Sequence, residues 1–385
     1  MKPKLRFKNF NNEWEEIELR NIASEIAYGM NSASKEYDGE NKYIRITDID
    51  ENSNRYSNKD VVSPDGILED RFLVKENDIL FARTGASTGK TYLYNSNDGK
   101  LYYAGFLIKA SIINHNSNFI FQQTKLNKYN NWIKIMSMRS GQPGINSQEY
   151  GSYRFSITNI DEENKVSNFL SLIDKKIELQ SKKIEDLKLF KRGLFHKLFD
   201  DIDGNNYLLS DIANFENGKG HENIINDNGD YILINSKFIS TEGNVIKKCS
   251  EQLTPLFKDD ITMVMSDLPN GKALAKCYYI EEDNKYSLNQ RICKIHIKND
   301  KIINPKYLFY LLNRNPYYLK FDDGVNQTNL KKDDILNINL NIPSKDVQDK
   351  NSKILTTVDN IINKESIKLS KLEALKKGLM QNMFV

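Results

Sequence analysis

A 35-residue segment with helical character occurs twice in this chain of 385 residues, at 165–199 and again at 350–384. A constant shift of 185 residues aligns the two copies without a gap. The duplication predicts a pseudo-symmetric protein in which two similar globular modules are each followed by a long helix. Such a chain imitates a two-fold dimer. That geometry suits a two-part target with dyad character, of which duplex DNA is the commonest example.

Each copy carries an apolar seam at alternating steps of four and three residues, which is the pattern of a coiled coil. In the first copy the seam is formed by Val166, Leu170, Ile173, Ile177, Ile184, Leu187, Leu194 and Leu198. Both seams are interrupted at the same places, where Gln180 corresponds to Glu365 and Lys191 corresponds to Lys376. The shared interruptions favour two helices of about 50 Å, at ~1.5 Å per residue, that pair with each other. Two amphipathic helices that each pack on their own domain are the alternative.

The globular halves are related as well, because short sequence anchors recur in the same order while the residues between them diverge. Tyr43–Ile46 and Tyr231–Ile234 occupy matching places, as strand cores. Short β-branched and aromatic runs predict further strands, and the run NPKYLFYLLN predicts a short helix. The fold class is therefore α+β, with two pseudo-symmetric α/β domains joined by two long helices that form a coiled coil. We place the domains at 1–160 and 201–345 and the helices at 161–200 and 346–385.

Composition narrows the class of protein only a little. The chain is 39% hydrophobic and 28% charged, which is normal for a folded soluble protein. It has neither an apolar stretch of about 20 residues nor an apolar signal core, so we expect a cytoplasmic protein. Its three cysteines form no CxxC pair and are expected to be reduced core thiols. The net charge of +3 is small, so a DNA-binding role would require Lys and Arg concentrated on one face.

The stretch ARTGASTGKT, at 82–91, is similar to a phosphate-binding P-loop. The P-loop consensus needs four residues between its glycine and the Gly-Lys pair, whereas Gly85 and Gly89 enclose only three. We therefore interpret this stretch as a strand-to-strand loop that presents Arg83 and Lys90 to a DNA backbone or a base edge. A simple glycine-rich turn with solvated charges is the alternative.

Two further loops, 140–150 and 323–334, are rich in Gly, Asn and Gln. Amide side chains can read adenine and Arg can read guanine in the major groove. The alternative is a structural role in which Asn146 and Asn329 cap short helices. Glycines next to Lys219 suggest a further loop that could approach phosphate closely. The candidate DNA-binding residues are Arg45, Arg83, Ser87, Lys90, Arg139, Gln142, Asn146, Lys219, Asn270, Lys272, Asn326 and Gln327.

The sequence contains no recognisable catalytic signature. It lacks a G-x-S-x-G nucleophile elbow and an HExxH metal motif, and its four histidines have no metal-ligand spacing. An adenine-methyltransferase tetrapeptide and a G-x-G cofactor loop are also missing. We therefore expect a protein that is not an enzyme and binds neither metal nor cofactor.

Four features, taken together, connect this chain to a known family. They are the opening LRFKNFNNEWEEIELRNIA, the stretch ENDILFARTGASTGKTYL, the helix ends KRGLFHKLF and KKGLMQNMF, and the duplicated halves. In combination they resemble the specificity subunits of Type I restriction–modification systems, over essentially the whole chain. The second half departs from the ARTGASTGKT pattern.

The resemblance implies that each half is a target-recognition domain that reads one part of a split DNA sequence. It also implies that the two long helices pack antiparallel and act as a ruler between the domains. Such a subunit does no chemistry itself. It docks two methyltransferase subunits, which bind S-adenosylmethionine, and restriction subunits, which use ATP and Mg²⁺. A coiled-coil adaptor that tethers two protein partners is the alternative, although it would not explain divergent surfaces on matched scaffolds.

Overall fold

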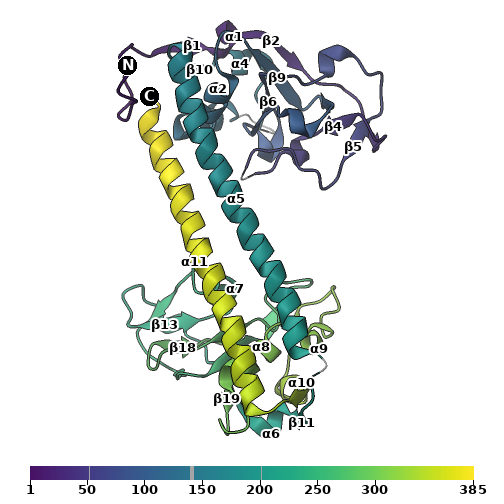
Figure 1. Ribbon diagram of the computed structural model, residues 1–385, viewed down its shortest axis with the longest axis vertical. Coiled ribbons are helices and arrows are strands. Elements are labelled where there is room, and N and C mark those ends of the chain that lie inside the picture. The colour runs from purple at the N-terminus through teal and green to yellow at the C-terminus, as the bar shows by residue number, and fades with distance from the viewer. Residues whose placement is uncertain (52, 139–142, 201) are drawn as a thin grey trace. The chain divides into compact units, whose positions relative to one another are not determined.

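The computed structural model describes residues 1–51, 53–138, 143–200 and 202–385. Contacts divide the chain into two units. Unit 1 comprises Met1–Lys182 and Ile367–Val385, and unit 2 comprises Lys183–Ser366. Each unit holds one α+β domain together with a part of both long helices, α5 (Ile160–Phe199) and α11 (Lys345–Met383) (Figure 1). The predicted α+β class and the two long helices are confirmed.

The domain of unit 1 contains ten strands, four short α-helices and four 3₁₀ helices within its described residues. The strands are β1 (Glu15–Glu18), β2 (Ala23–Tyr28), β3 (Ser34–Glu36), β4 (Lys42–Ile44), β5 (Val62–Pro64), β6 (Asp78–Ala82), β7 (Thr91–Leu93), β8 (Leu101–Tyr103), β9 (Leu107–Ile112) and β10 (Arg154–Ile157). The α-helices are α1 (Leu19–Ile22), α2 (Ser117–Gln123), α3 (Asn127–Met136) and α4 (Ser147–Ser152).

The domain of unit 2 repeats this plan. Its strands are β11 (Asn205–Leu208), β12 (Ala213–Asn217), β13 (Tyr231–Ile234), β14 (Lys248–Cys249), β15 (Ile261–Val264), β16 (Ser266–Asp267), β17 (Cys277–Tyr279), β18 (Tyr286–Leu288), β19 (Ile292–Ile297), β20 (Thr328–Asn329) and β21 (Asn339–Ile342). Its helices are α6 (Leu209–Ile212), α7 (Ser236–Ser240), α8 (Pro305–Leu312), α9 (Pro316–Leu319) and α10 (Lys332–Leu336).

The main sheets of the two units have the same topology. In unit 1 the strand order is β2-β9-β6-β7, in unit 2 it is β12-β19-β15-β17, and all neighbours are antiparallel. A parallel pair, β4-β8 or β13-β18, accompanies each sheet. The central strands β6 and β15 are buried along their whole length, which explains their continuous apolar sequence. Matching pairings at matching places confirm that the two halves are copies of one scaffold.

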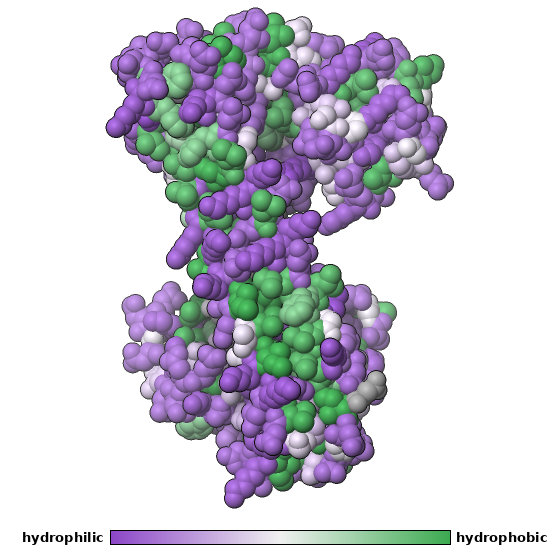
Figure 2. Space-filling model, viewed as in Figure 1, coloured by the Kyte–Doolittle hydropathy of each residue, from purple (hydrophilic) through white to green (hydrophobic). Residues whose placement is uncertain are grey.

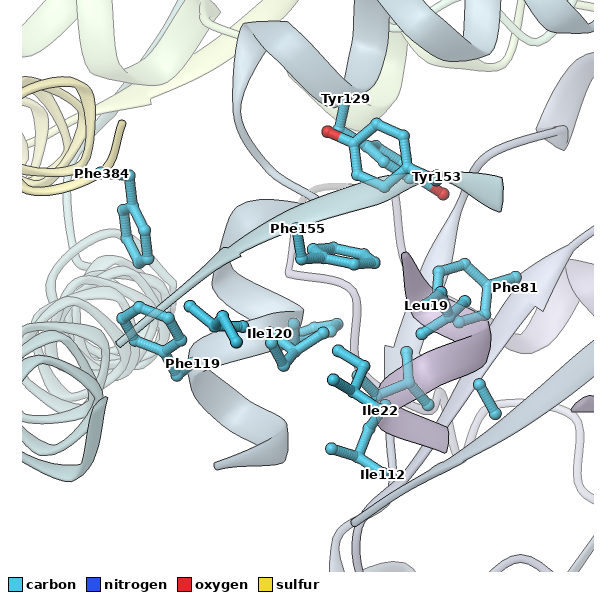
Figure 3. Packing of buried hydrophobic residues seen from close by; sticks show 14 of the residues in the cluster. Leu19, Ile22, Phe81, Ile112, Phe119, Ile120, Tyr129, Tyr153, Phe155 and Phe384 are labelled. Atoms are coloured by element: carbon cyan, nitrogen blue, oxygen red, sulfur yellow. The ribbon is translucent and has the colours of Figure 1, made fainter. Parts of the chain in front are cut away.

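In each unit the end of a long helix packs into the core of the domain. In unit 1 the ring of Phe384, just after α11, lies 5.1 Å from that of Phe119 on α2 (Figure 3). In unit 2 Phe199, the matching residue at the end of α5, stacks on Tyr307 of α8 with ring centroids 4.7 Å apart. Burying a phenylalanine side chain contributes about 1.5–3 kcal/mol, so these rings anchor the helices to the domains.

The helix segments also pair with each other inside each unit, and they run antiparallel. In unit 1 Asp174 of α5 lies 2.5 Å from Lys376 of α11. In unit 2 Lys191 of α5 lies 2.5 Å from Asp359 of α11, and Asn351 of α11 donates to the Leu198 carbonyl. Because residue numbers rise on one helix as they fall on the other, the pairing is antiparallel, and the predicted coiled coil is confirmed. The lysines that interrupt the seams are therefore used in interhelical ion pairs.

The same aspartates connect the helix pairs to the domains. Gln122 of α2 donates to the second oxygen of Asp174, and the hydroxyl of Tyr310 on α8 donates to the second oxygen of Asp359. Each aspartate therefore binds one lysine of the opposite helix and one side chain of its domain.

Among the helices of the described residues, none combines the length and the hydropathy that a membrane span needs.

Candidate nucleic-acid interface

Four segments that are far apart in the sequence of unit 1 meet through backbone hydrogen bonds. Residues 83–88 follow β6, and there Arg83 O accepts from Ile145 N at 2.9 Å while Gly85 N donates to Pro143 O at 2.9 Å. Arg83 N donates to Phe106 O, in the turn before β9, at 3.0 Å. Gly105 N of that turn donates to Met30 O at 2.7 Å. We define surface 1 as Met30 with residues 83–88, 104–106 and 143–146.

Unit 2 repeats these connections at the corresponding residues. Met265 O accepts from Leu330 N at 2.8 Å, and Met265 N donates to Arg291 O at 3.0 Å. Gln290 N donates to Lys219 O at 3.0 Å, and β16 pairs with β20. We define surface 2 as Lys219 with residues 265–274, 289–291 and 323–330. The hydrogen bonds therefore join loops that are distant in the sequence into one continuous surface in each unit.

The side chains on the two surfaces differ even though the backbone arrangement is shared. On surface 1 the guanidinium carbon of Arg83 lies 4.7 Å from the ring centroid of Tyr28, and Arg83 Nη1 donates to the Gly105 carbonyl at 3.4 Å. Met265 takes the corresponding place on surface 2. The exposed Phe106 of surface 1 is matched by the exposed Arg291 on surface 2. A cationic group is thus present on both surfaces, but in a different position.

The glycine-rich stretch of surface 1 connects two antiparallel strands, β6 and β7, so the predicted strand-to-strand loop is confirmed. A P-loop would lead into a helix instead. Gly89 has φ +90°, and a Cβ atom there would lie 2.6 Å from Ile133 Cγ2. Any other residue would be strained at this position. The glycine is therefore required by backbone geometry and close packing against α3.

The loop of surface 2 is shaped by a carboxylate. Asp267 Oδ2 accepts hydrogen bonds from Ala273 N at 2.7 Å and from Leu274 N at 3.1 Å. A Cβ atom at Gly271 would lie 2.1 Å from the same oxygen, so a larger residue there would displace the Asp267 carboxylate from this position. Asn270, with φ +55°, donates to the Gly324 carbonyl at 3.2 Å and ties the two loops together. These contacts shape the loop and join it to residues 323–330.

Several predicted residues lie on these surfaces. Ser87 is half-buried in the loop of surface 1. Lys219 and Lys272 are exposed on surface 2, and neither has an ion-pair partner among the described residues. Gln327 donates to Ser266 Oγ at 2.7 Å, and Asn326 donates to Asp323 at 3.1 Å. The side chains of Lys219 and Lys272 are therefore available to a ligand.

Two predicted basic residues are engaged elsewhere in unit 1. Arg45 binds Asp48 at 2.8 Å and Asp60 at 2.9 Å, and the hydrogen bond to Asp48 raises the pKa of the guanidinium. Lys90 donates to the Ile49 carbonyl at 3.2 Å and lies 3.4 Å from Glu51. These contacts favour a structural role for both residues.

The cap predictions had different outcomes. Asn146 caps α4, since its side chain accepts from Glu149 N at 2.9 Å and Glu149 accepts from Asn146 N at 2.7 Å. Asn329 does not cap α10, whose N-cap is Lys331, so the alternative of a capping role is wrong for this residue. Asp334 accepts from Lys331 N at 2.8 Å, and the helix begins at Lys332. Asn329 lies in β20 and pairs with Ser266 of β16. Arg139 and Gln142 lie outside the described residues.

Sequence reasoning missed three residues of this interface. Tyr28 contacts Arg83 from a strand that no motif marks, and Phe106 and Arg291 also lie outside every motif. The sequence did contain a signal for Phe106 and Arg291, because the same shift of 185 residues that aligns the helices also aligns these two residues.

The described residues contain no group of three or more His, Cys, Asp or Glu side chains placed to hold a metal ion.

Comparisons with known proteins agree on one family. The model of the Type I restriction modification DNA specificity domain matches residues 11–189 and again residues 203–374. The Type I restriction enzyme MjaVIII specificity subunit of Methanocaldococcus jannaschii is 22% identical over 350 residues, which cover 82% of this chain and 80% of that relative.

Two solved structures are similar along nearly the whole chain. The crystal structure of a Type I restriction-modification system S subunit from M. genitalium matches with a TM-score of 0.65 at 18% identity, covering 100% of this chain and 99% of that one. A structure described as explaining complex assembly and conformational transition of the type I R-M system matches with a TM-score of 0.57 at 13% identity, covering 96% and 97%. At these identities the two structures show a shared fold.

Proposed function

Because the chain belongs to the family of Type I restriction modification DNA specificity domains, we propose that it reads a bipartite DNA target, with one half-site for each unit. Surface 1 contacts one half-site and surface 2 contacts the other. The bases between the half-sites are not read, since sequence information comes only from base edges that a side chain reaches.

One observation carries this proposal: the same four-segment surface occurs twice, with different side chains on it. A duplicated scaffold provides the same docking geometry in both units, and different side chains provide different base preferences. Arg83 on surface 1 is held by Tyr28, so its fork of donors is directed before DNA arrives, which suits a bidentate contact with guanine. Lys219, Lys272 and Arg291 supply phosphate contacts on surface 2.

The long helices hold the half-sites apart and dock partner subunits. Gly193 of α5 and Gly378 of α11 are matching helix residues, and a Cβ atom at either would meet nothing within 4 Å. Exposed Phe190 and Leu375 precede the two glycines by three residues. Each unit therefore offers an apolar, open helix face, and Figure 2 shows a contiguous hydrophobic area on unit 2. Two such faces suit two copies of a methyltransferase subunit.

The chain supplies recognition while its partners supply chemistry. We expect S-adenosylmethionine on the methyltransferase subunits, and ATP with Mg²⁺ on restriction subunits. The purified chain alone should neither transfer methyl groups nor hydrolyse ATP.

The proposal is tested by co-expressing the chain with its cognate methyltransferase subunit and mapping methylated adenines in host DNA. A split motif is expected. A chimera that replaces residues 1–150 with those of a relative should change one half of the motif and leave the other half intact. Methylation without sequence preference would favour the adaptor alternative, and a chimera that alters both half-sites would overturn the assignment of one half-site to each unit.

A further inference from the structure

Two large apolar side chains project from surface 2 into solvent. Leu268 is 69% exposed and Val325 is 76% exposed. They lie on the two loops of unit 2 that the Asn270–Gly324 hydrogen bond joins. A ligand that covered one of these side chains would gain about 1.5–3 kcal/mol from its burial.

The backbone holds both residues in place. At Leu268, the N–H donates to Asp267 Oδ1 at 2.9 Å and the carbonyl accepts from Gly271 N at 2.9 Å, which closes a tight turn. At Val325, the N–H donates to Asp323 Oδ1 at 2.9 Å, and the same oxygen accepts from Asn326 N at 2.9 Å. Both apolar groups are therefore presented at fixed points, as base recognition requires.

The surroundings of these two side chains are polar, and surface 2 carries three cations and two carboxylates. The carboxylates of Asp267 and Asp323 accept hydrogen bonds from backbone N–H groups of their own loops. Lys272 and Arg291 on the same surface are exposed and have no ion-pair partner among the described residues. Gln327 adds an amide next to Asn326. A partner that covers this surface must therefore carry negative charge and hydrogen-bonding edges together with small apolar groups. Duplex DNA has that combination, and the apolar group on its major-groove base edges is the C5-methyl group of thymine.

We propose that unit 2 reads at least one thymine in its half-site through contact of the C5-methyl group with Leu268 and Val325. The inference rests on the proposed function and adds a base identity to it. Loop 83–88 of surface 1 places Ala86, Ser87 and Thr88 where surface 2 carries Leu268, so this part of the two surfaces reads DNA differently. The polar neighbours Lys272 and Gln327 contact the DNA backbone and the adjacent base edges.

The test uses the full chain bound to its methyltransferase subunit and duplexes that carry the mapped motif. Each thymine of the unit 2 half-site, on either strand, is replaced by uracil, which removes the methyl group and leaves the hydrogen-bonding edges unchanged. At one or more positions we expect binding to weaken roughly fourfold for each methyl group removed. In the Leu268→Ser variant, the preference for thymine over uracil should be lost at the positions that Leu268 contacts. In Val325→Thr, which keeps one of the two methyl groups, the preference should be reduced.

A matched control is Val245→Thr, which makes the same change at another exposed valine of unit 2, outside surface 2. That variant should keep the full preference for thymine. Uracil effects in the unit 1 half-site should also persist in the Leu268 and Val325 variants. Thermal unfolding of each variant shows that the loops still fold, and Val325→Thr keeps the shape of the side chain.

The outcomes separate the two proposals. Binding without preference for the mapped motif would overturn the proposed function. If the chain bound specifically to a unit 2 half-site that contains no thymine, or that tolerates uracil at every position, the thymine contact alone would be overturned. A uracil penalty that stays the same in both variants would also overturn it, because another residue would then read the methyl group.

Discussion

Gln348 occupies in unit 2 the place that Glu163 occupies in unit 1. Each lies in the first turns of a long helix and holds the start of a domain helix. Glu163 Oε2 accepts from Asn116 N at 2.9 Å, and Gln348 Oε1 accepts from Asn304 N at 2.7 Å. The remaining contacts differ. Glu163 binds the imidazole of His115 at 2.9 Å, whereas the Gln348 amide donates to the Ile302 and Pro343 carbonyls at 2.9 Å.

The first prediction is that unit 1 loses stability as pH rises, because of the contact between Glu163 and His115. The matching contacts of Gln348 in unit 2 should not depend on pH. The hydrogen bond to Glu163 raises the pKa of His115, against the opposing effect of burial. A group with a raised folded pKa contributes stability that is fully present below its unfolded pKa, about 6.5, and is lost as pH rises through the folded value. Urea unfolding of the full chain across this range, monitored by the tryptophans of unit 1, measures the effect.

The Glu163→Gln variant is its control. The amide oxygen can still accept from Asn116 N, as Gln348 does from Asn304, so most of the stability should remain. The pH dependence assigned to the ion pair should disappear. If wild type and variant lose stability in parallel over this range, His115 is not the group responsible.

The second prediction concerns the reciprocal change, Gln348→Glu. A carboxylate there would face the Ile302 and Pro343 carbonyls, to which the Gln348 amide donates. An uncompensated buried charge costs roughly 3–5 kcal/mol, so unit 2 should be destabilised at neutral pH and recover as the carboxyl group is protonated in acid. Urea unfolding at pH 7 and at about pH 5 measures the difference. Equal stability at both values would contradict the burial of this group.

The third prediction separates two arginines that the sequence did not distinguish. Arg83→Met should weaken binding to the unit 1 half-site by ~1–3 kcal/mol and relax the preference for one base. Arg45→Met should instead lower stability, since it leaves the buried Asp48 carboxylate without its main partner. Binding to the mapped motif and thermal unfolding are compared for both. A binding defect confined to Arg45→Met would reverse the assignment.

The fourth prediction is that the helices set the distance between half-sites. One heptad is inserted after Lys182 of α5 and one after Ser366 of α11, at the boundaries of the two units, so the contacts inside each unit stay intact. The helices lengthen by ~10 Å, and the gap in the methylated motif should grow by about three base pairs with unchanged half-sites. A single-residue insertion rotates the seam by ~100° and should abolish specific methylation. An unchanged gap after the heptad insertion would mean that the helices are not the ruler.

The fifth prediction concerns the matching helix glycines. Gly193→Ala and Gly378→Ala should each raise the stability of the chain by about 1 kcal/mol, because glycine disfavours helix and the space around each Cβ position is open. Gly193→Leu and Gly378→Leu should fold as well but weaken binding of the methyltransferase subunit. Thermal unfolding and co-purification distinguish the two effects. Normal co-purification of both leucine variants would place the docking surface elsewhere.

Features that depend on short-range order and on repetition could be predicted from the sequence. The heptad seams with their shared lysines, the strand cores, the helix cap at Asn146 and the duplication are all written in neighbouring residues or in a constant shift. Hydrophobic periodicity identifies such elements because it reports which face of each element is buried. The family resemblance rested on the same repeated segments.

Which loops meet, and which charged side chains stay available to a ligand, depends on long-range packing. Arg83 joins Ile145, and Arg45 meets Asp60, across intervals of the sequence that no local pattern marks. Asn329 had the residue type of a helix cap, yet strand pairing with Ser266 took it and Asp334 began the helix instead. A polar side chain bonds to whichever partner packing brings within about 3 Å, so its role follows from the fold and not from its own sequence context.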